Sequence, residues 1–119
     1  MGYNAYTHSG TKRVRMSFDK IIHYLNSLGI GEILLNSINR DGTLQGYDLK
    51  LIQDIANQTS VPIIACGGCK SPESLLEALI NGASAAAAGS IFTFKGSKNS
   101  VLINYPSQST LNSVIFSAL

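Results

Sequence analysis

The chain has 119 residues, of which 45% are hydrophobic, which is enough for one domain with a core. Only 13% of the residues are charged, which is low for the large relative surface of a short domain. We therefore expect a partner or a missing half of the fold to cover part of this surface. A formal net charge of +2 is too small to indicate nucleic-acid binding, and no apolar run approaches the roughly 20 residues that span a membrane. The first residues lack a signal-peptide pattern, so a cytoplasmic protein is expected.

Two strands and one helix are predicted in the first third of the chain. Residues 3–8 are rich in aromatic side chains and are predicted to form a strand. Ser17 is the expected N-cap of a helix whose apolar residues recur at helical spacing as far as Gly29. Residues 32–38 contain the continuous apolar run Ile33–Leu35, which is typical of a strand buried on both faces.

Two further strand–helix units are expected after a polar, turn-rich loop at residues 39–43. Asp48 is placed to cap a helix that has apolar residues along one face, and residues 61–66 form another short buried strand. A helix with Ser71 as its N-cap and proline as its first residue follows. The run of small residues at 83–88 is the fourth predicted strand.

The predicted strands begin near residues 3, 32, 61 and 84, about 23 to 29 residues apart, which is the size of one βα unit. Right-handed crossovers make such strands parallel. The pattern leaves two closures open, namely an open doubly wound sheet and half of an eight-stranded barrel. It predicts an α/β domain over residues 1–95 and a tail over residues 96–119 with a final short strand and helix.

Glycine-bearing turns follow the third and fourth predicted strands, at Gly67-Gly68 and at Gly89-Ser90. Glycine lets the backbone approach an anion closely, and N–H groups at the start of a helix point toward it with a favourable dipole. Phosphate sites of (β/α)₈ barrels recur in the loops after strands seven and eight. Two such turns at matching strand ends therefore predict one phosphate site held from two sides.

Other polar residues have ordinary structural interpretations. Asp41-Gly42 is either a carboxylate and a backbone N–H at the mouth of the site or a plain turn, and without further context the turn is favoured. The basic cluster of Lys12, Arg13 and Arg15 is interpreted as a solvated loop, with a site for an anionic substrate as the alternative.

Cys66 and Cys69 form a CxxC sequence, which is found in redox pairs and in metal sites. The chain has no second cysteine pair, and its two histidines are distant in sequence. We therefore expect two reduced thiols beside a glycine turn and no metal site.

The stretch of residues 31–43, with the sequence GEILLNSINRDGT, is long and specific. Together with residues 46–48, 62–68 and 89–92 it resembles the sixth-strand and later motifs of the cyclase subunit of imidazole glycerol phosphate synthase, a (β/α)₈ barrel of histidine biosynthesis. Residues 7–10 resemble the stretch after that family's fifth strand. The resemblance covers most of the chain and implies the C-terminal half of a (β/α)₈ TIM barrel, with about four βα units.

Carried over residue by residue, the resemblance implies one phosphate site and two residues that line the barrel mouth. The phosphate-binding residues would be Asp41, Gly42, Gly67, Gly68, Gly89 and Ser90, and the mouth-lining residues would be Ser9 and Asn36. The family's two catalytic carboxylates lie at positions before Met1, so no catalytic residue is expected in this chain. No cofactor and no metal are implied.

The resemblance also implies an ammonia-dependent lyase that receives ammonia from a glutaminase subunit and acts on a phosphorylated ribosyl substrate. Without the catalytic carboxylates the chain alone is expected to be inactive. Asn39 replaces an aspartate common in the family, and Cys69 replaces a small residue. Residues 101–106 look more like a paralogue that helps to amidate surface-glycan sugars.

Three hypotheses remain open. The chain is half of an ammonia-accepting cyclase or its amidation paralogue, or a stand-alone phosphate-binding half barrel, or a truncated product with no role of its own. A half barrel has two unpaired sheet edges, which favours pairing with an N-terminal half or with a second copy. The sequence does not decide between histidine biosynthesis and glycan amidation, or whether Met1 is the natural start, or whether the isolated half is folded, dimeric or active.

Overall fold

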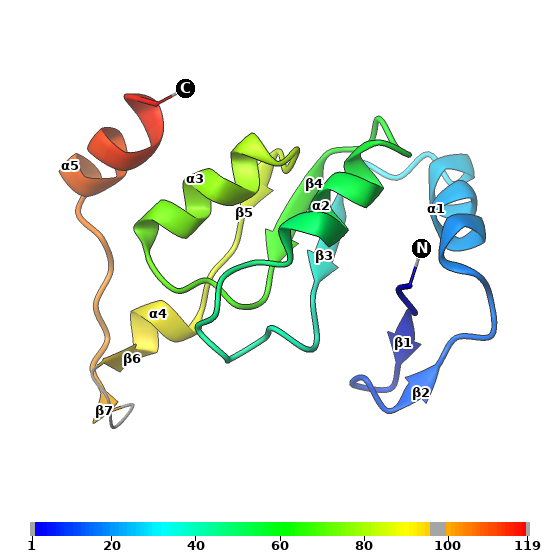
Figure 1. Cartoon of the computed structure of the whole chain (residues 1–119), viewed down its shortest axis with the longest axis horizontal. Coiled ribbons are helices and arrows are strands. Elements are labelled where there is room, and N and C mark those ends of the chain that lie inside the picture. Colours follow the sequence, from blue (N-terminus) through cyan, green and yellow to red (C-terminus); the bar gives the residue numbers. More distant parts are fainter. Residues whose placement is uncertain (1, 96–99, 119) are drawn as a thin grey trace.

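The computed structural model of the chain describes residues 2–95 and 100–118. Strands and helices alternate through its central part (Figure 1), in the order α1 (Phe18–Ser27), β3 (Ile33–Asn36), α2 (Leu49–Ala56), β4 (Ile63–Cys66), α3 (Pro72–Ile80) and β5 (Ala85–Ala86). Two short strands precede this part, β1 (Tyr6–Thr7) and β2 (Lys12–Arg13). After it come α4 (Ser90–Thr93), β6 (Phe94–Lys95), β7 (Ser100–Val101), α5 (Gln108–Leu111) and a π-helix over Asn112–Phe116.

A three-stranded parallel sheet lies at the centre of the fold. Its strand order is β3-β4-β5, so β4 pairs with both of the others. The register places Leu34 opposite Ile64 and Ile64 opposite Ala85, and one pleat further along it places Asn36 opposite Cys66. The parallel sheet with alternating helices confirms the predicted α/β class. None of the described helices is long and apolar enough to cross a membrane.

The first predicted strand does not join this sheet, which corrects the expectation of a parallel strand over residues 3–8. β1 has only two residues and pairs antiparallel with β2. The hairpin between them turns through His8, Ser9 and Gly10, which all have positive φ angles, of 52°, 55° and 81°. Because the chain reverses there, the first strand finds its hydrogen-bond partner in the adjacent segment rather than in β3.

The expected helices are present with the predicted starts. Asp48 caps α2, and its side chain accepts a hydrogen bond from the amide of Leu51. Proline begins α3 as predicted. Ser17 and Ser71 occupy the N-cap positions of α1 and α3, but neither makes a side-chain capping bond. The tail predicted from residue 96 begins in residues 96–99, which lie outside the described residues.

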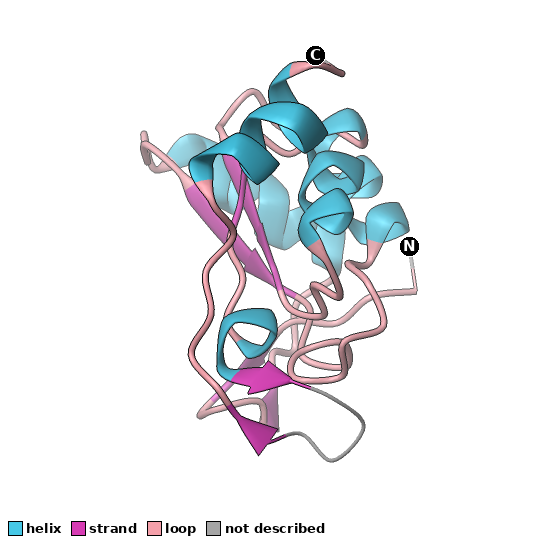
Figure 2. Ribbon diagram, turned by 90° about the vertical axis from the view of Figure 1, so that its left-hand side faces the viewer, coloured by secondary structure: helices cyan, strands magenta, loops and turns pink. Residues whose placement is uncertain are grey.

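The core lies between the sheet and the helices, in two clusters of buried side chains. One contains Ile22, Leu51, Ile55 and Ile63, from α1, α2 and β4. The other joins the sheet to α2 and α3 and contains Tyr47, Ile52, Ala65, Cys69, Leu75, Ala78 and Ala83. Figure 2 shows the longer helices gathered beside the sheet, with α4 and the short strands β6 and β7 apart from them.

The opposite side of the sheet is uncovered, which corrects the expectation that residues 32–38 are buried on both faces. Ile33 is buried, whereas Leu34 is 64% exposed. Side chains on a strand alternate between faces, so the uncovered sheet face consists of Leu34, Asn36, Ile64, Cys66 and Ala85. A strand of this apolar composition needs a second layer, and this chain supplies helices on one side only.

The segment before β1 is held against α2 by Tyr3. The Tyr3 hydroxyl donates a hydrogen bond of 3.0 Å to Oδ1 of Asp48, the same oxygen that caps α2. The Tyr3 ring also packs against Phe18, with the ring centroids 5.9 Å apart. One carboxylate therefore joins the start of the chain to the start of a helix.

Replacing Tyr3 with phenylalanine is expected to lower the free energy of unfolding by roughly 1 kcal/mol at neutral pH. Burial and the hydrogen bond to Asp48 raise the pKa of Tyr3 to about 12. Because this pKa exceeds the unfolded value of 10.0, the contribution is fully present below pH 10 and is lost as the pH rises to 12. Urea unfolding of both proteins at pH 8 and at pH 11–12 checks this, and a difference that is unchanged at high pH would contradict it.

Candidate anion-binding site at the strand ends

One pocket lies at the carboxyl ends of the three parallel strands. Parallel strands end at the same edge of a sheet, so the turns after β3, β4 and β5 meet there. The residues that line the pocket are Asp41, Gly42, Leu44, Cys66, Gly67, Gly68, Cys69, Ala87, Ala88, Gly89 and Ser90. All six residues predicted to bind phosphate are among them. The structure therefore brings three turns together, whereas the turn pattern alone had pointed to two.

The backbone amides of five of the six residues predicted to bind phosphate are unbonded. Within the described residues, no hydrogen bond is donated by the amides of Gly42, Gly67, Gly68, Gly89 or Ser90. The amide of Asp41 differs, because it donates to the carbonyl of Ser37 at 2.9 Å. Buried amides without partners are uncommon in folded proteins, and Gly67 and Gly68 are both buried. Residues with unbonded amides thus line the pocket from three separate turns.

The turn after β4 requires glycine at two successive positions. Gly67 and Gly68 have φ angles of 91° and 98°, in a region that side-chain-bearing residues rarely adopt. A Cβ atom on Gly67 would lie 2.7 Å from the carbonyl oxygen of Ser37, and one on Gly68 would collide with the carbonyl oxygen of Gly46. Gly89 differs, because its φ is −130° and a Cβ atom added there would have no other atom within 4 Å.

The loop between β3 and α2 is tied to both of the other turns. The amide of Gly46 donates to the carbonyl of Gly68 at 2.6 Å. The hydroxyl of Tyr47 donates to the carbonyl of Ala87 at 2.7 Å, at the end of β5. Tyr47 is 4% exposed, and burial raises its pKa strongly, so the hydroxyl stays protonated. Sequence reasoning missed Tyr47, because a tyrosine before a helix carries no signal of a partner 40 residues away.

The two predicted mouth-lining residues have different positions. Asn36 ends β3, and its side-chain amide donates to the carboxylate of Asp41 at 3.4 Å. Asp41 is therefore held by a side chain of the sheet. Ser9 lies in the exposed turn of the β1–β2 hairpin and does not line the pocket. The hairpin does approach the loop after β3, since the α-carbon of Gly10 faces the side chain of Ile38.

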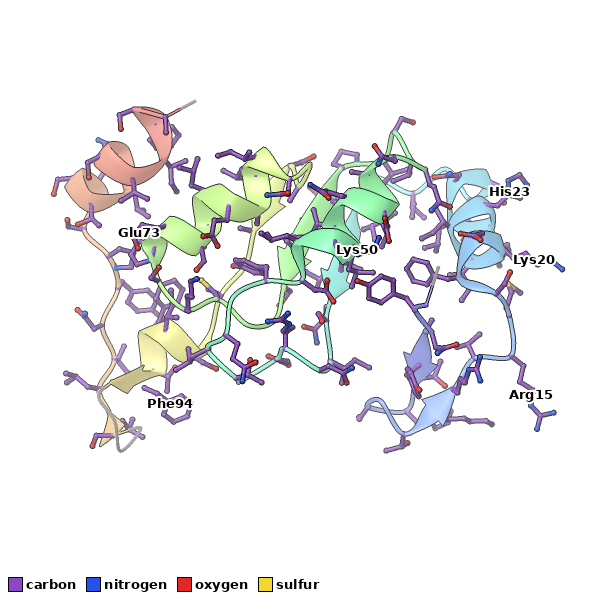
Figure 3. All side chains as sticks on the ribbon, in the orientation of Figure 1. Arg15, Lys20, His23, Lys50, Glu73 and Phe94 are labelled. Atoms are coloured by element: carbon purple, nitrogen blue, oxygen red, sulfur yellow. The ribbon has the colours of Figure 1, made fainter. Side chains whose placement is uncertain are left out.

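The basic cluster also lies outside the pocket. Lys12, Arg13 and Arg15 are exposed, and they border a separate open groove at residues 12–17. Figure 3 shows the Arg15 side chain pointing away from the body of the protein. The cluster is exposed as predicted, but Lys12 and Arg13 form strand β2 rather than a loop.

Cys66 and Cys69 are free thiols on different sides of the sheet. Strand alternation places Cys66 on the uncovered sheet face, whereas Cys69 packs with Ala65 in the helix-side cluster. Burial raises the pKa of Cys69, whose thiol donates to the carbonyl of Ser71 at 3.5 Å. Within the described residues, no group of three or more His, Cys, Asp or Glu side chains is arranged to hold a metal ion.

Gly68, with a positive φ angle, and Gly89, with a negative one, allow a test of whether the turn after β4 requires glycine. Gly68→Ala is expected to lower the free energy of unfolding by about 1–3 kcal/mol, because alanine is strained at this φ and its Cβ meets backbone. Gly89→Ala, the matched control, should change it by less than about 0.5 kcal/mol. Urea unfolding of both variants measures the difference. Equal effects would show that the turn after β4 does not need its glycine.

Comparison with known proteins assigns the chain to a family. The model of the family described as histidine biosynthesis protein matches residues 2–98. A putative imidazole glycerol phosphate synthase subunit HisF of Leptospira interrogans is 39% identical over 89% of this chain and 42% of its own length. The putative subunit hisF2 of Pseudomonas aeruginosa is 40% identical over 93% of this chain and 45% of its own length. Subunit HisF of Corynebacterium diphtheriae is 42% identical over 78% of this chain and 36% of its own length.

The chain thus spans about two-fifths of the length of these relatives. That share agrees with the observed strand–helix units, which make up part of a barrel rather than a closed one. The chain belongs to the histidine biosynthesis protein family and corresponds to part of the (β/α)₈ barrel of its HisF members.

Proposed function

We propose that this chain forms the phosphate-holding half of an imidazole glycerol phosphate synthase cyclase barrel. The carrying observation is that residues of three turns line one pocket with unbonded amides. In this role Gly42, Gly67, Gly68, Gly89 and Ser90 donate hydrogen bonds to one phosphate group of a phosphorylated ribosyl substrate. Backbone amides suit an anion because they are fixed in place before it arrives and bond more strongly to a charged acceptor.

The pocket's size and charge predict a weak affinity for phosphate alone. Its cavity volume of about 20 Å³ exceeds the ~10–15 Å³ that one water-sized group needs, so one phosphate oxygen can enter while the others stay at the mouth. None of the lining residues is Lys or Arg, and the Asp41 carboxylate opposes an anion. We expect a dissociation constant on the order of 1 mM for inorganic phosphate, with the rest of the substrate supplying further affinity.

The other half of the barrel is assigned to units that this chain does not contain. The uncovered sheet face is apolar at Leu34, Ile64 and Ala85, and the other βα units of a barrel would cover it. In this proposal those units carry the two catalytic carboxylates, and a glutaminase subunit supplies ammonia. The short coverage of the relatives supports this division.

A phosphate titration followed by ¹⁵N NMR tests the site. Inorganic phosphate is expected to shift the amide signals of Gly42, Gly67, Gly68, Gly89 and Ser90, with one common dissociation constant. Sodium chloride at equal ionic strength is the control, and the amide of Gly29 in the distant loop after α1 should respond to neither salt. Absence of a saturable shift at the five amides would contradict the proposal.

Complementation tests the half-barrel assignment. Co-expressed with the preceding βα units of a HisF relative, the chain is expected to co-purify with them and to restore ammonia-dependent turnover of the cyclase substrate. The chain alone should show no turnover, because general acid–base chemistry needs carboxylates that it lacks. Turnover by the isolated chain, or a co-purified complex without turnover, would count against the cyclase assignment.

A second candidate is the cyclase-like paralogue that helps to amidate surface-glycan sugars. The observation that favours it is the extent of similarity. The putative subunits hisF2 of Pseudomonas aeruginosa and hisF3 of Vibrio vulnificus align over 112 residues, whereas HisF of Corynebacterium diphtheriae aligns over 93. Alignments that cover 90–93% of the chain include residues 101–106, where the sequence resembles that paralogue. The complementation assay separates the two candidates, because the paralogue would form the complex without turning over the histidine-pathway substrate.

A further inference from the structure

Two consecutive residues connect all three turns of the pocket. Gly46 and Tyr47 end the loop that follows β3, and Gly42 lies in the same loop. The amide of Gly46 bonds to the turn after β4, through the Gly68 carbonyl at 2.6 Å. The hydroxyl of Tyr47 bonds to the end of β5, through the Ala87 carbonyl at 2.7 Å. One dipeptide thus sets the separation of the turn after β3 from each of the other two.

The bond from Tyr47 holds the turn after β5, which has few hydrogen bonds to the rest of the pocket. β5 has two residues, and its pairing with β4 ends where the amide of Ala87 bonds to Ala65 at 2.8 Å. Between Ala87 and Ser90, within the described residues, no other hydrogen bond joins this turn to the rest of the pocket. Ala88 and Ile91 pack against the core cluster that contains Tyr47, so Tyr47 helps to set the position of Ser90 relative to Gly42 and Gly68 through this packing and through its hydrogen bond to Ala87.

The direction of one further amide follows from the same bond. The Ala87 carbonyl and the Ala88 amide belong to one planar trans peptide, in which the C=O and N–H groups point in opposite directions. Because Tyr47 holds the carbonyl, the Ala88 N–H is directed away from Tyr47. Ala88 lines the pocket, and its amide donates to no group in the described part of the chain.

We propose that Gly46 and Tyr47 form a clamp that positions the three turns for phosphate, with Tyr47 as the positioning residue of the turn after β5. The inference rests on the proposed function, since it concerns the affinity of that same pocket. Tyr47 does not line the pocket. It acts through Ala87 and Ser90, and its hydroxyl also interacts with the Cys69 thiol in the turn after β4. The amide of Gly46 still holds that turn when the hydroxyl is lost, so the turn after β5 is expected to be affected most.

A double-mutant cycle tests the clamp, with inorganic phosphate as the ligand and NMR titration of the whole chain as the measurement. Tyr47→Phe removes one hydroxyl and keeps the ring, and it is expected to raise the dissociation constant about five- to tenfold. Ser90 lines the pocket, and its hydroxyl is expected to donate to phosphate beside its amide. Ser90→Ala, which removes the hydroxyl and keeps the amide, should raise the dissociation constant about three- to tenfold in the wild type. In the Tyr47→Phe background the increase should be less than twofold, because the turn is then already displaced.

Tyr3→Phe is the matched control. It also removes a single tyrosine hydroxyl whose bond spans a long stretch of sequence, but its partner is the α2 cap and not a pocket turn. It should keep the dissociation constant for phosphate within twofold of the wild-type value. It should also leave unchanged the factor by which Ser90→Ala raises that constant. A general loss of stability would affect both tyrosine variants, so only positioning predicts different affinities for the two.

A wild-type measurement keeps the test decisive if Tyr47→Phe does not fold. Coupling between a bond and a ligand is reciprocal, so saturating phosphate is expected to slow solvent exchange of the Tyr47 hydroxyl proton and not that of Tyr3. Wild-type binding with equal affinity in Tyr47→Phe, additive effects of the two mutations, or unchanged exchange would overturn the clamp alone. A wild type that binds no phosphate would overturn the clamp and the proposed function together.

Discussion

The parallel pairing of β4 with both β3 and β5 determines where the crossover helices and the pocket of this protein lie. Parallel strands need crossovers, and the crossovers here place α2 and α3 on one face of the sheet. The same pairing brings three loops to one edge, where they form the pocket. It also leaves the opposite face uncovered, with Leu34 exposed in the middle of β3. The pocket and the incomplete barrel are thus two results of one topology.

The parts of the fold that sequence predicts well are those governed by local rules. Asp48 and Pro72 mark helix starts through capping and through a missing N–H, and both helices begin as predicted. The errors concern tertiary partners. The strand predicted over residues 3–8 pairs within a hairpin, because three successive residues adopt positive φ. The exposure of Leu34 could not be predicted, because an apolar run indicates a buried strand whether or not this chain provides the cover.

In the candidate site, too, features set by local rules are predictable from sequence and features set by distant contacts are not. Gly67 and Gly68 are recognisable in sequence, because a glycine pair after a strand indicates backbone that other residues avoid, and their φ angles bear this out. Ser9, which only the family resemblance indicated, lies outside the pocket. Tyr47 and the unbonded amides had no local signal, since a hydrogen bond to Ala87 and the absence of one at Gly89 both depend on how distant segments meet. Local geometry and the meeting of the two glycine turns are thus predictable here, whereas hydrogen bonds between distant segments are not.

The central claim is that free amides from three turns converge on one anion. A crystal structure of the chain with inorganic phosphate tests it most directly. The account predicts a phosphate at the pocket with its oxygens about 2.7–3.2 Å from amide nitrogens of the turns after β4 and β5, and with Gly42 completing the third side. A pocket that stays empty at saturating phosphate, or amides that bond internally or diverge, would contradict it.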